Sequence, residues 1–171
     1  TLVVKSGHPH IWSNGFDLDW VAARYGAGDK ESVARFLVRD IELRIRLLTY
    51  PQITVAAFTG HVFGGAAVLS CCFDFRFMRS DRGYFCIPVV DRGYPILSGT
   101  RELLGNVLPP SLVPELILTG RRLTGGHAQP RRLARSCSVC ARTPHRSPRL
   151  SCAPGSMPRS SPISPSPTPS S

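Results

Sequence analysis

A charge-free apolar segment, Ile53–Phe73, places the strongest constraint on how this chain can fold. It contains no Lys, Arg, Asp or Glu, and glycine interrupts it at Gly60 and again at the pair Gly64–Gly65. Three structures are compatible with such a segment. They are a membrane span, a buried strand followed by a buried helix, and a strand–turn–helix whose backbone N–H groups face a ligand. Thr59 and His61 near the middle, and ends without aromatic and basic anchors, argue against a membrane span.

The remainder of the chain up to about residue 126 alternates strand-like and helix-like segments. We expect strands at 2–5, 53–58 and 73–78, an extended segment at 85–90, and helices at 17–25, 30–50, 64–72, 100–107 and 112–118. A loop is expected at 6–16. Lys30–Tyr50 is the clearest helix, and we expect one apolar stripe of it to face the core: Val33, Leu37, Ile41, Ile45 and Leu48. This alternation predicts an α/β domain with helices packed on a sheet.

Charge and composition divide the chain near Gly125–Gly126. Residues 1–126 carry 14 basic and 11 acidic side chains, whereas residues 127–171 carry seven Arg and no acidic side chain. The second part also contains nine Pro and 11 Ser, so we predict a folded domain at 1–126 and a disordered tail at 127–171. The tail has no aromatic residue for base stacking, and we expect no specific nucleic-acid partner. Without a core around its Cys and His residues, we expect no metal site either.

Two glycine-containing loops are candidates for an anion site. Gly64–Gly65 opens a predicted helix, where N–H groups lack acceptors and the helix dipole favours negative charge. Alone, such a pair more often indicates tight helix–strand packing. The loop Ser13–Leu18 also lies between a strand and a helix, and alone it is an ordinary turn with Asp17 as the helix N-cap. Together, the loops could place two N–H donors around one oxygen, as in an oxyanion hole.

The residues around these loops resemble a known family. HPHIWSNGFDLDW, followed by PQITVAAFTGHVFGGAAVLSCCFDFRFMRSDRGYFCIPVVDRG and by LTGRRLT, is similar to the enoyl-CoA hydratase/isomerase (crotonase) superfamily. DFRFMRSDRGYFC looks most like the Δ3,Δ2-enoyl-CoA isomerase branch, which includes plant peroxisomal members. The resemblance runs from about Leu2 to Leu123. It implies a crotonase-like (ClpP/crotonase) spiral of ββα units, truncated at the N-terminus and followed by a tail that is foreign to the family.

The resemblance also implies roles for individual residues. The N–H groups of Phe16 and Gly65 would form the oxyanion hole for the thioester oxygen of an acyl-CoA as it becomes an enolate. The other residues implied in substrate binding are Ser13, Asn14, Gly15, Asp17, Leu18, Gly60, Gly64, Pro88 and Val89. No cofactor is implied, since coenzyme A is part of the substrate. The family is often trimeric, which implies a homo-trimer.

The sequence departs from the family pattern where proton transfer is expected. The hydratase glutamate corresponds to Val68, and the isomerase glutamate that follows a proline corresponds to Val89. Valine cannot transfer a proton, so the expected general base is absent. Asp91 lies two residues on and would point to the same side of an extended segment as Val89. It is therefore a candidate substitute base, and the alternative for it is a capping or surface role.

Two functions follow from the resemblance. The first is an enoyl-CoA isomerase of unsaturated fatty acid β-oxidation, which moves a proton between C2 and C4 of the acyl chain. The alternative is a catalytically impaired protein that binds acyl-CoA or another subunit without turnover. The resemblance implies a peroxisomal location, although this sequence does not carry the C-terminal signal, and a cytoplasmic or mitochondrial location is the alternative.

Overall fold

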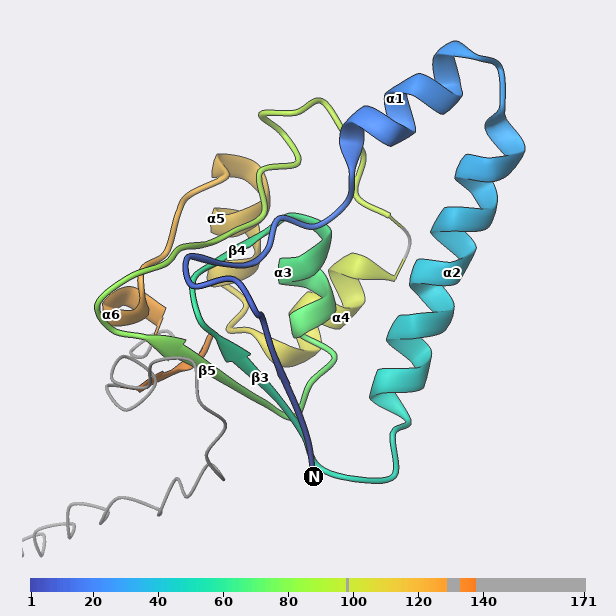
Figure 1. The fold of residues 1–171 in the computed structure, drawn as a ribbon. Helices are drawn as coiled ribbons and strands as arrows, with labels where there is room; N and C mark the ends of the chain where they lie inside the picture. Colours follow the sequence, from blue (N-terminus) through green and yellow to red (C-terminus); the bar gives the residue numbers. More distant parts are fainter. Residues whose placement is uncertain (98, 129–132, 138–171) are drawn as a thin grey trace, which may run out of the picture.

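The computed structural model describes residues 1–97, 99–128 and 133–137 (Figure 1). These residues contain two parallel sheets. The first sheet contains, in spatial order, β1 (Leu2–Lys5), β3 (Thr54–Phe58), β5 (Phe75–Arg79) and β7 (Arg135–Cys137). The second contains β2 (Ile11–Ser13), β4 (His61–Phe63) and β6 (Phe85–Cys86). Neighbouring strands within both sheets are parallel. Parallel neighbours require crossover connections, and the helices supply most of these.

Successive strands alternate between the two sheets, and helices follow each pair. The pair β1 and β2 leads into α1 (Leu18–Gly26) and α2 (Lys30–Leu48), and the pair β3 and β4 leads into α3 (Gly65–Ser70). After β5 and β6 come α4 (Thr100–Val107) and α5 (Leu112–Thr119), and α6 (Gly125–Ala128) precedes β7. The predicted α/β class is therefore confirmed, in the form of a spiral of ββα units.

The core lies where the two sheets meet α3, α4 and α5. In β3, burial alternates along the strand so that Ala56 and Phe58 face the core. Met78 from β5, Phe85 from β6 and Leu116 from α5 are completely buried against them. The charge-free segment thus forms two strands and a short helix. Among the described residues, no helix has the length and apolar character that a membrane span requires.

Helix α2 is rotated relative to the prediction. Its Ile41, Ile45 and Leu48 are 43, 55 and 56% exposed, so most of the predicted stripe does not face the core. Val33 is buried as predicted, and the other buried positions on the helix are Asp40 and Arg44, which form an ion pair. The prediction was wrong because hydrophobicity alone does not anticipate a charged pair on the inner face, where each charge compensates the other. Figure 1 shows α2 at the side of the molecule, apart from β3 and β5.

The predicted loop at 6–16 contains a strand that the sequence did not indicate. Strand β2 spans only three residues, and its pairing with β4 places it in the second sheet. The Trp12 side chain from this strand packs edge-on against Phe58, with ring centroids 5.2 Å apart. So short a strand has too little alternation to be recognised, because long-range pairing and not local pattern stabilises it.

The folded part continues beyond the boundary predicted at residue 126. Leu133 and Ala134 are buried, and β7 adds to the first sheet beside β5. The carbonyl oxygen of Leu133 accepts a hydrogen bond of 3.0 Å from Arg76 Nε, which ties this segment to β5. Residues 138–171 of the predicted disordered tail lie outside the described residues. In the part that the structure describes, no group of three His, Cys, Asp or Glu side chains could hold a metal ion.

Candidate functional site

The two glycine loops meet beside the second sheet. Gly15 follows β2 and Gly64 follows β4, and both have a positive φ, 85° and 55°, which favours glycine. A Cβ atom on Gly15 would lie 2.7 Å from the Phe63 carbonyl oxygen and 2.8 Å from the Gly65 nitrogen. The two turns are therefore packed backbone against backbone. Residues separated by about fifty positions in the sequence are brought together at this point.

Two backbone N–H groups at this junction have no hydrogen-bond partner among the described residues. The N–H of Gly64 donates to the Cys86 carbonyl oxygen at 3.0 Å, which joins the turn to β6. In the described part of the chain, the N–H groups of Phe16 and Gly65 donate to no protein acceptor. Gly65 is the first residue of α3, where the helix itself supplies no acceptor. Free donors on adjacent backbones can stabilise an oxygen that carries negative charge.

The Phe16 ring covers the start of α3. A Cβ atom on Gly65 would lie 2.7 Å from Phe16 Cε1, so the ring packs directly on the glycine. The Phe16 ring also packs edge-on against Phe36 of α2, with ring centroids 4.9 Å apart. The loop that carries the Phe16 N–H is held further by Asp17, whose carboxylate accepts from the Trp20 N–H at 3.0 Å. The predicted N-cap role of Asp17 is confirmed.

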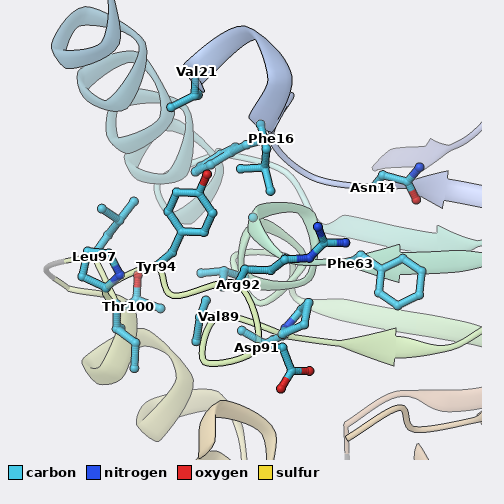
Figure 2. Close-up of a pocket in the computed structure, with 18 of the residues that line it drawn as sticks. Asn14, Phe16, Val21, Phe63, Val89, Asp91, Arg92, Tyr94, Leu97 and Thr100 are labelled. Atoms are coloured by element: carbon cyan, nitrogen blue, oxygen red, sulfur yellow. The ribbon is translucent and has the colours of Figure 1, made fainter. Parts of the chain in front are cut away.

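A cavity of about 1050 Å³ opens at this junction. Its walls come from the two glycine loops, from α1 and α2, and from the segment between β6 and α4. Figure 2 shows Asn14 and Phe63 at one end and Leu97 and Thr100 at the other, with Phe16, Val89 and Arg92 between them. Apolar side chains make up most of the cavity lining as a whole. This volume is at the upper end of the range for small-molecule sites.

Most of the residues predicted for the site line this cavity. They are Asn14, Phe16, Asp17, Leu18, Gly64, Gly65, Pro88, Val89 and Asp91. Three predicted residues do not line the cavity and instead shape the turns behind it: Ser13, Gly15 and Gly60. Ser13 Oγ accepts a hydrogen bond of 3.2 Å from the Gly15 N–H. Gly60 packs on the backbone of His10, whose carbonyl oxygen a Cβ atom would approach to 1.9 Å.

Few of the described side chains near the Phe16 and Gly65 N–H groups can transfer a proton. Val89 is half-buried and packs against the core. Asp91 Oδ2 lies against Gly120, where a Cβ atom would come within 2.7 Å of it, and Figure 2 shows its carboxylate pointing away from Phe16. The Cys86 thiol donates to the Gly120 carbonyl oxygen at 3.0 Å. Burial raises the pKa of this thiol, so Cys86 stays protonated at neutral pH.

Sequence reasoning missed several charged or polar residues that line the cavity, and four of them bear on its chemistry. They are Arg44, Arg92, Thr100 and Arg122. Only Arg44 had a usable signal, because Asp40 lies four residues before it and would share its helix face. Arg92 lies in a loop and Arg122 follows a helix, and no local pattern relates either one to the glycine turns. The guanidinium of Arg122 lies 6.0 Å from the centre of the Phe63 ring, at the mouth of the cavity.

Known proteins match both the sequence and the fold. The sequence model described as enoyl-CoA hydratase/isomerase matches residues 1–135. The chain belongs to this family. Enoyl-CoA delta isomerase 3 of Arabidopsis thaliana is 30% identical over 129 residues, which cover 75% of this chain and 54% of that protein. The peroxisomal enoyl-CoA delta isomerase 2 of Arabidopsis thaliana is also 30% identical, over 133 residues, with the same coverage.

A solved structure gives the corresponding result for the fold. The enoyl-CoA hydratase EchA3 of Mycobacterium ulcerans superposes with a TM-score of 0.72 at 27% identity, covering 82% of this chain and 59% of that one. The predicted crotonase fold is therefore confirmed, and the resemblance to plant enoyl-CoA isomerases is confirmed as well. The chain spans little more than half the length of the curated relatives that it matches. All of the site residues described above fall within the matched residues 1–135.

Proposed function

We propose that this chain binds an acyl-CoA thioester and holds the thioester oxygen with the N–H groups of Phe16 and Gly65. The observation that carries this proposal is the contact between the Gly15 and Gly65 backbones, which brings two unpaired donors to the mouth of a large apolar cavity. The curated relatives with isomerase names support the acyl-CoA part of the proposal. An acyl chain suits the mostly apolar lining of the cavity.

The chemistry that such a site favours is formation of an enolate. As a proton leaves C2 of a 3-enoyl thioester, negative charge develops on the carbonyl oxygen, and the two N–H donors stabilise it in a site that excludes water. Return of the proton to C4 then gives the conjugated 2-enoyl thioester. Such proton transfer requires a base near C2, and typically contributes 10²–10⁴-fold to the rate. We propose Asp91 as this base, which would require its carboxylate to turn from Gly120 toward the cavity.

Binding without turnover is the second candidate function. Two points favour it: the family resemblance places Val89 where the isomerases carry their glutamate, and the Asp91 carboxylate points away from Phe16. In this case the N–H groups would hold the thioester oxygen and no side chain would move the proton. The two functions differ only in the base, so substitutions at positions 89 and 91 separate them.

The experiment follows conversion of 3-hexenoyl-CoA to 2-hexenoyl-CoA by the absorbance of the conjugated product, together with binding by calorimetry. We expect weak activity in the wild type and a gain of about 10²-fold or more in Val89→Glu. The matched control is Val90→Glu, because Val90 is 53% exposed and does not line the cavity. Equal rates in the two variants would contradict the placement of the site. If Asp91→Asn leaves the wild-type rate unchanged, Asp91 is not the base.

The wider role follows from the relatives. We propose that the chain acts in β-oxidation of unsaturated fatty acids, in the peroxisome, as the name of one Arabidopsis relative suggests. We further propose assembly as a homo-trimer. Sedimentation velocity of the purified chain tests the trimer, and microscopy of the full-length native protein tests its location. A monomer, or a uniform cytoplasmic distribution, would contradict the respective proposal.

A further inference from the structure

A second, smaller cavity borders the Phe16 ring. Its volume is about 420 Å³, and its walls come from β1, β2, α2, α3 and the loop that follows β2. Trp12 of β2, Leu43 of α2 and Leu69 of α3 line this small cavity and do not line the large cavity at the glycine loops. Its volume falls within the range of small-molecule sites, so it can hold part of a ligand.

Three residues line both cavities and form the partition between them: Phe16, Phe36 and Gly65. The Phe16 ring contacts the other two. A Cβ atom on Gly65 would lie 2.7 Å from Phe16 Cε1, and the rings of Phe16 and Phe36 pack edge-on with their centroids 4.9 Å apart. Gly65 and Phe36 belong to helices, whereas Phe16 lies in the loop between β2 and α1. The partition therefore depends on the side chain of this one loop residue.

The lining of the small cavity suits an alkyl group. Most of it is apolar. Of its charged residues, Lys5 and Arg39 are exposed, and the buried carboxylate of Asp40 is paired with Arg44. An alkyl group in this cavity would lose its contact with water and would break none of these interactions. A charged or strongly polar group would have no such advantage.

We propose that the Phe16 ring closes the small cavity and thereby restricts the site to acyl groups that are unbranched at C2. This inference rests on the proposed function, since it assumes that the thioester oxygen lies at the N–H groups of Phe16 and Gly65. C2 is bonded to the thioester carbon, so it lies close to these two residues and to the partition. A branched C2 carries two carbon substituents. One follows the large cavity toward Leu97 (Figure 2), and the other meets the Phe16 ring.

The two roles of Phe16 can be separated by substitution. Its backbone N–H holds the oxygen, and every residue except proline supplies that donor. Its ring closes the partition. Phe16→Ala therefore keeps the donor and joins the two cavities. Phe16→Leu keeps an apolar side chain on Gly65 and opens the partition less, so it supplies the same comparison if the alanine variant does not fold.

Binding of matched thioesters tests the inference. Hexanoyl-CoA and each enantiomer of 2-ethylhexanoyl-CoA are titrated by calorimetry against the wild type and Phe16→Ala; saturated chains exclude turnover. We expect the wild type to bind hexanoyl-CoA about tenfold more tightly than either branched form. Phe16→Ala should bind one enantiomer at least as tightly as hexanoyl-CoA, because burial of the ethyl group contributes about tenfold.

The outcomes separate this inference from the proposed function. If hexanoyl-CoA binds but the preference is the same in the wild type and the Phe16 variants, the inference is wrong and the proposed function stands. The same holds if the wild type binds a branched form as tightly as hexanoyl-CoA. If the wild type binds no thioester, both are overturned.

Further variants assign the change to the small cavity. Leu43→Trp fills this cavity from α2, so in the Phe16→Ala background it should restore the preference for hexanoyl-CoA. Leu97→Ala enlarges the large cavity alone and should not raise the relative affinity for a branched form. The opposite result for either variant would overturn the assignment.

Trp12 fluorescence locates the ethyl group directly. The chain contains two tryptophans, and of these Trp12 lines the small cavity whereas Trp20 lines neither cavity. Trp12 packs against Phe58, so its ring has a defined position on the cavity wall. In the Trp20→Phe/Phe16→Ala variant, the tighter-binding branched form should change the Trp12 emission, and hexanoyl-CoA should change it far less. Tight binding of a branched form with unchanged Trp12 emission would place the ethyl group elsewhere and overturn the inference.

Discussion

Substitution of Gly15 by alanine tests whether the contact between the two glycine loops sets the geometry of the donors. Gly15 has a φ of 85°, and its Cβ atom would lie 2.7 and 2.8 Å from backbone atoms of Phe63 and Gly65. Ordinary contact begins at 3.4 Å, so the loops would have to separate by about 0.7 Å. We expect two costs. The left-handed backbone costs an alanine about 1–2 kcal/mol, and the overpacking adds about 1–3 kcal/mol.

Ligand affinity should fall together with stability. A misplacement of 1 Å can cost 10²-fold in a precisely arranged site, so a shift of about 0.7 Å should weaken acyl-CoA binding roughly tenfold. Urea unfolding measures the first effect, and calorimetric titration with hexanoyl-CoA measures the second. Gly28→Ala is the matched control. Gly28 has a φ of 77°, and a Cβ atom there would meet nothing within 4 Å, so it carries the backbone cost alone.

The comparison between the two glycine variants decides the outcome. Gly15→Ala should be less stable than Gly28→Ala, and only Gly15→Ala should bind hexanoyl-CoA more weakly than the wild type. If the two variants have equal unfolding free energies and equal affinities, the loops either do not touch or do not position the donors. The assignment of Phe16 and Gly65 would then have to be abandoned.

Two further substitutions test the packing and the electrostatics around the site. Gly60→Ala would drive a Cβ atom to 1.9 Å from the His10 carbonyl oxygen, so we expect at least about 3 kcal/mol of destabilisation in urea; Gly105→Ala, which meets nothing within 4 Å, should cost far less. The hydrogen bond from Arg79 lowers the pKa of Asp81 from 3.8 to about 2, so its contribution to stability is present above pH 4 and disappears as the pH falls toward 2. Asp81→Asn should therefore lower the unfolding free energy at pH 6 and leave it nearly unchanged at pH 2; an equal loss at both values would exclude the ion pair as the cause.

Sequence patterns predicted those parts of the fold that local chemistry determines. The glycine pair at 64–65 marks the start of α3, and Asp17 caps α1 through its own side chain. Both signals act within a few residues, so they are visible in the sequence. The contact between the two glycine loops, in contrast, depends on residues far apart in the sequence. The two loops together made it one possibility, the family resemblance then related Phe16 to Gly65, and neither loop shows it alone.

Other features depend on contacts between distant residues and left little local trace. Strands β2 and β4 span three residues each, and their pairing stabilises them more than their composition does. The buried face of α2 was predicted wrongly because Arg44 is buried on it. Its charge is compensated there by Asp40, and it donates a hydrogen bond to Thr100, 56 positions away. A pattern of hydrophobic residues alone cannot distinguish a buried ion pair from a solvated one. The contribution of Arg44 and Thr100 to the cavity lining was missed for the same reason.

The alternation of strands between two sheets has a consequence for the order in which parts of the protein fold. In the first sheet, Leu2 pairs with Thr54, so β1 gains a neighbouring strand only after the chain has been synthesised as far as Thr54. Contacts of such separation slow folding, because a long loop must close before any pairing stabilises it. The glycine junction joins the first and second turns of the spiral, and the wall near Val89 belongs to the third. Affinity for a thioester should therefore be the last property to appear during refolding, after secondary structure has formed.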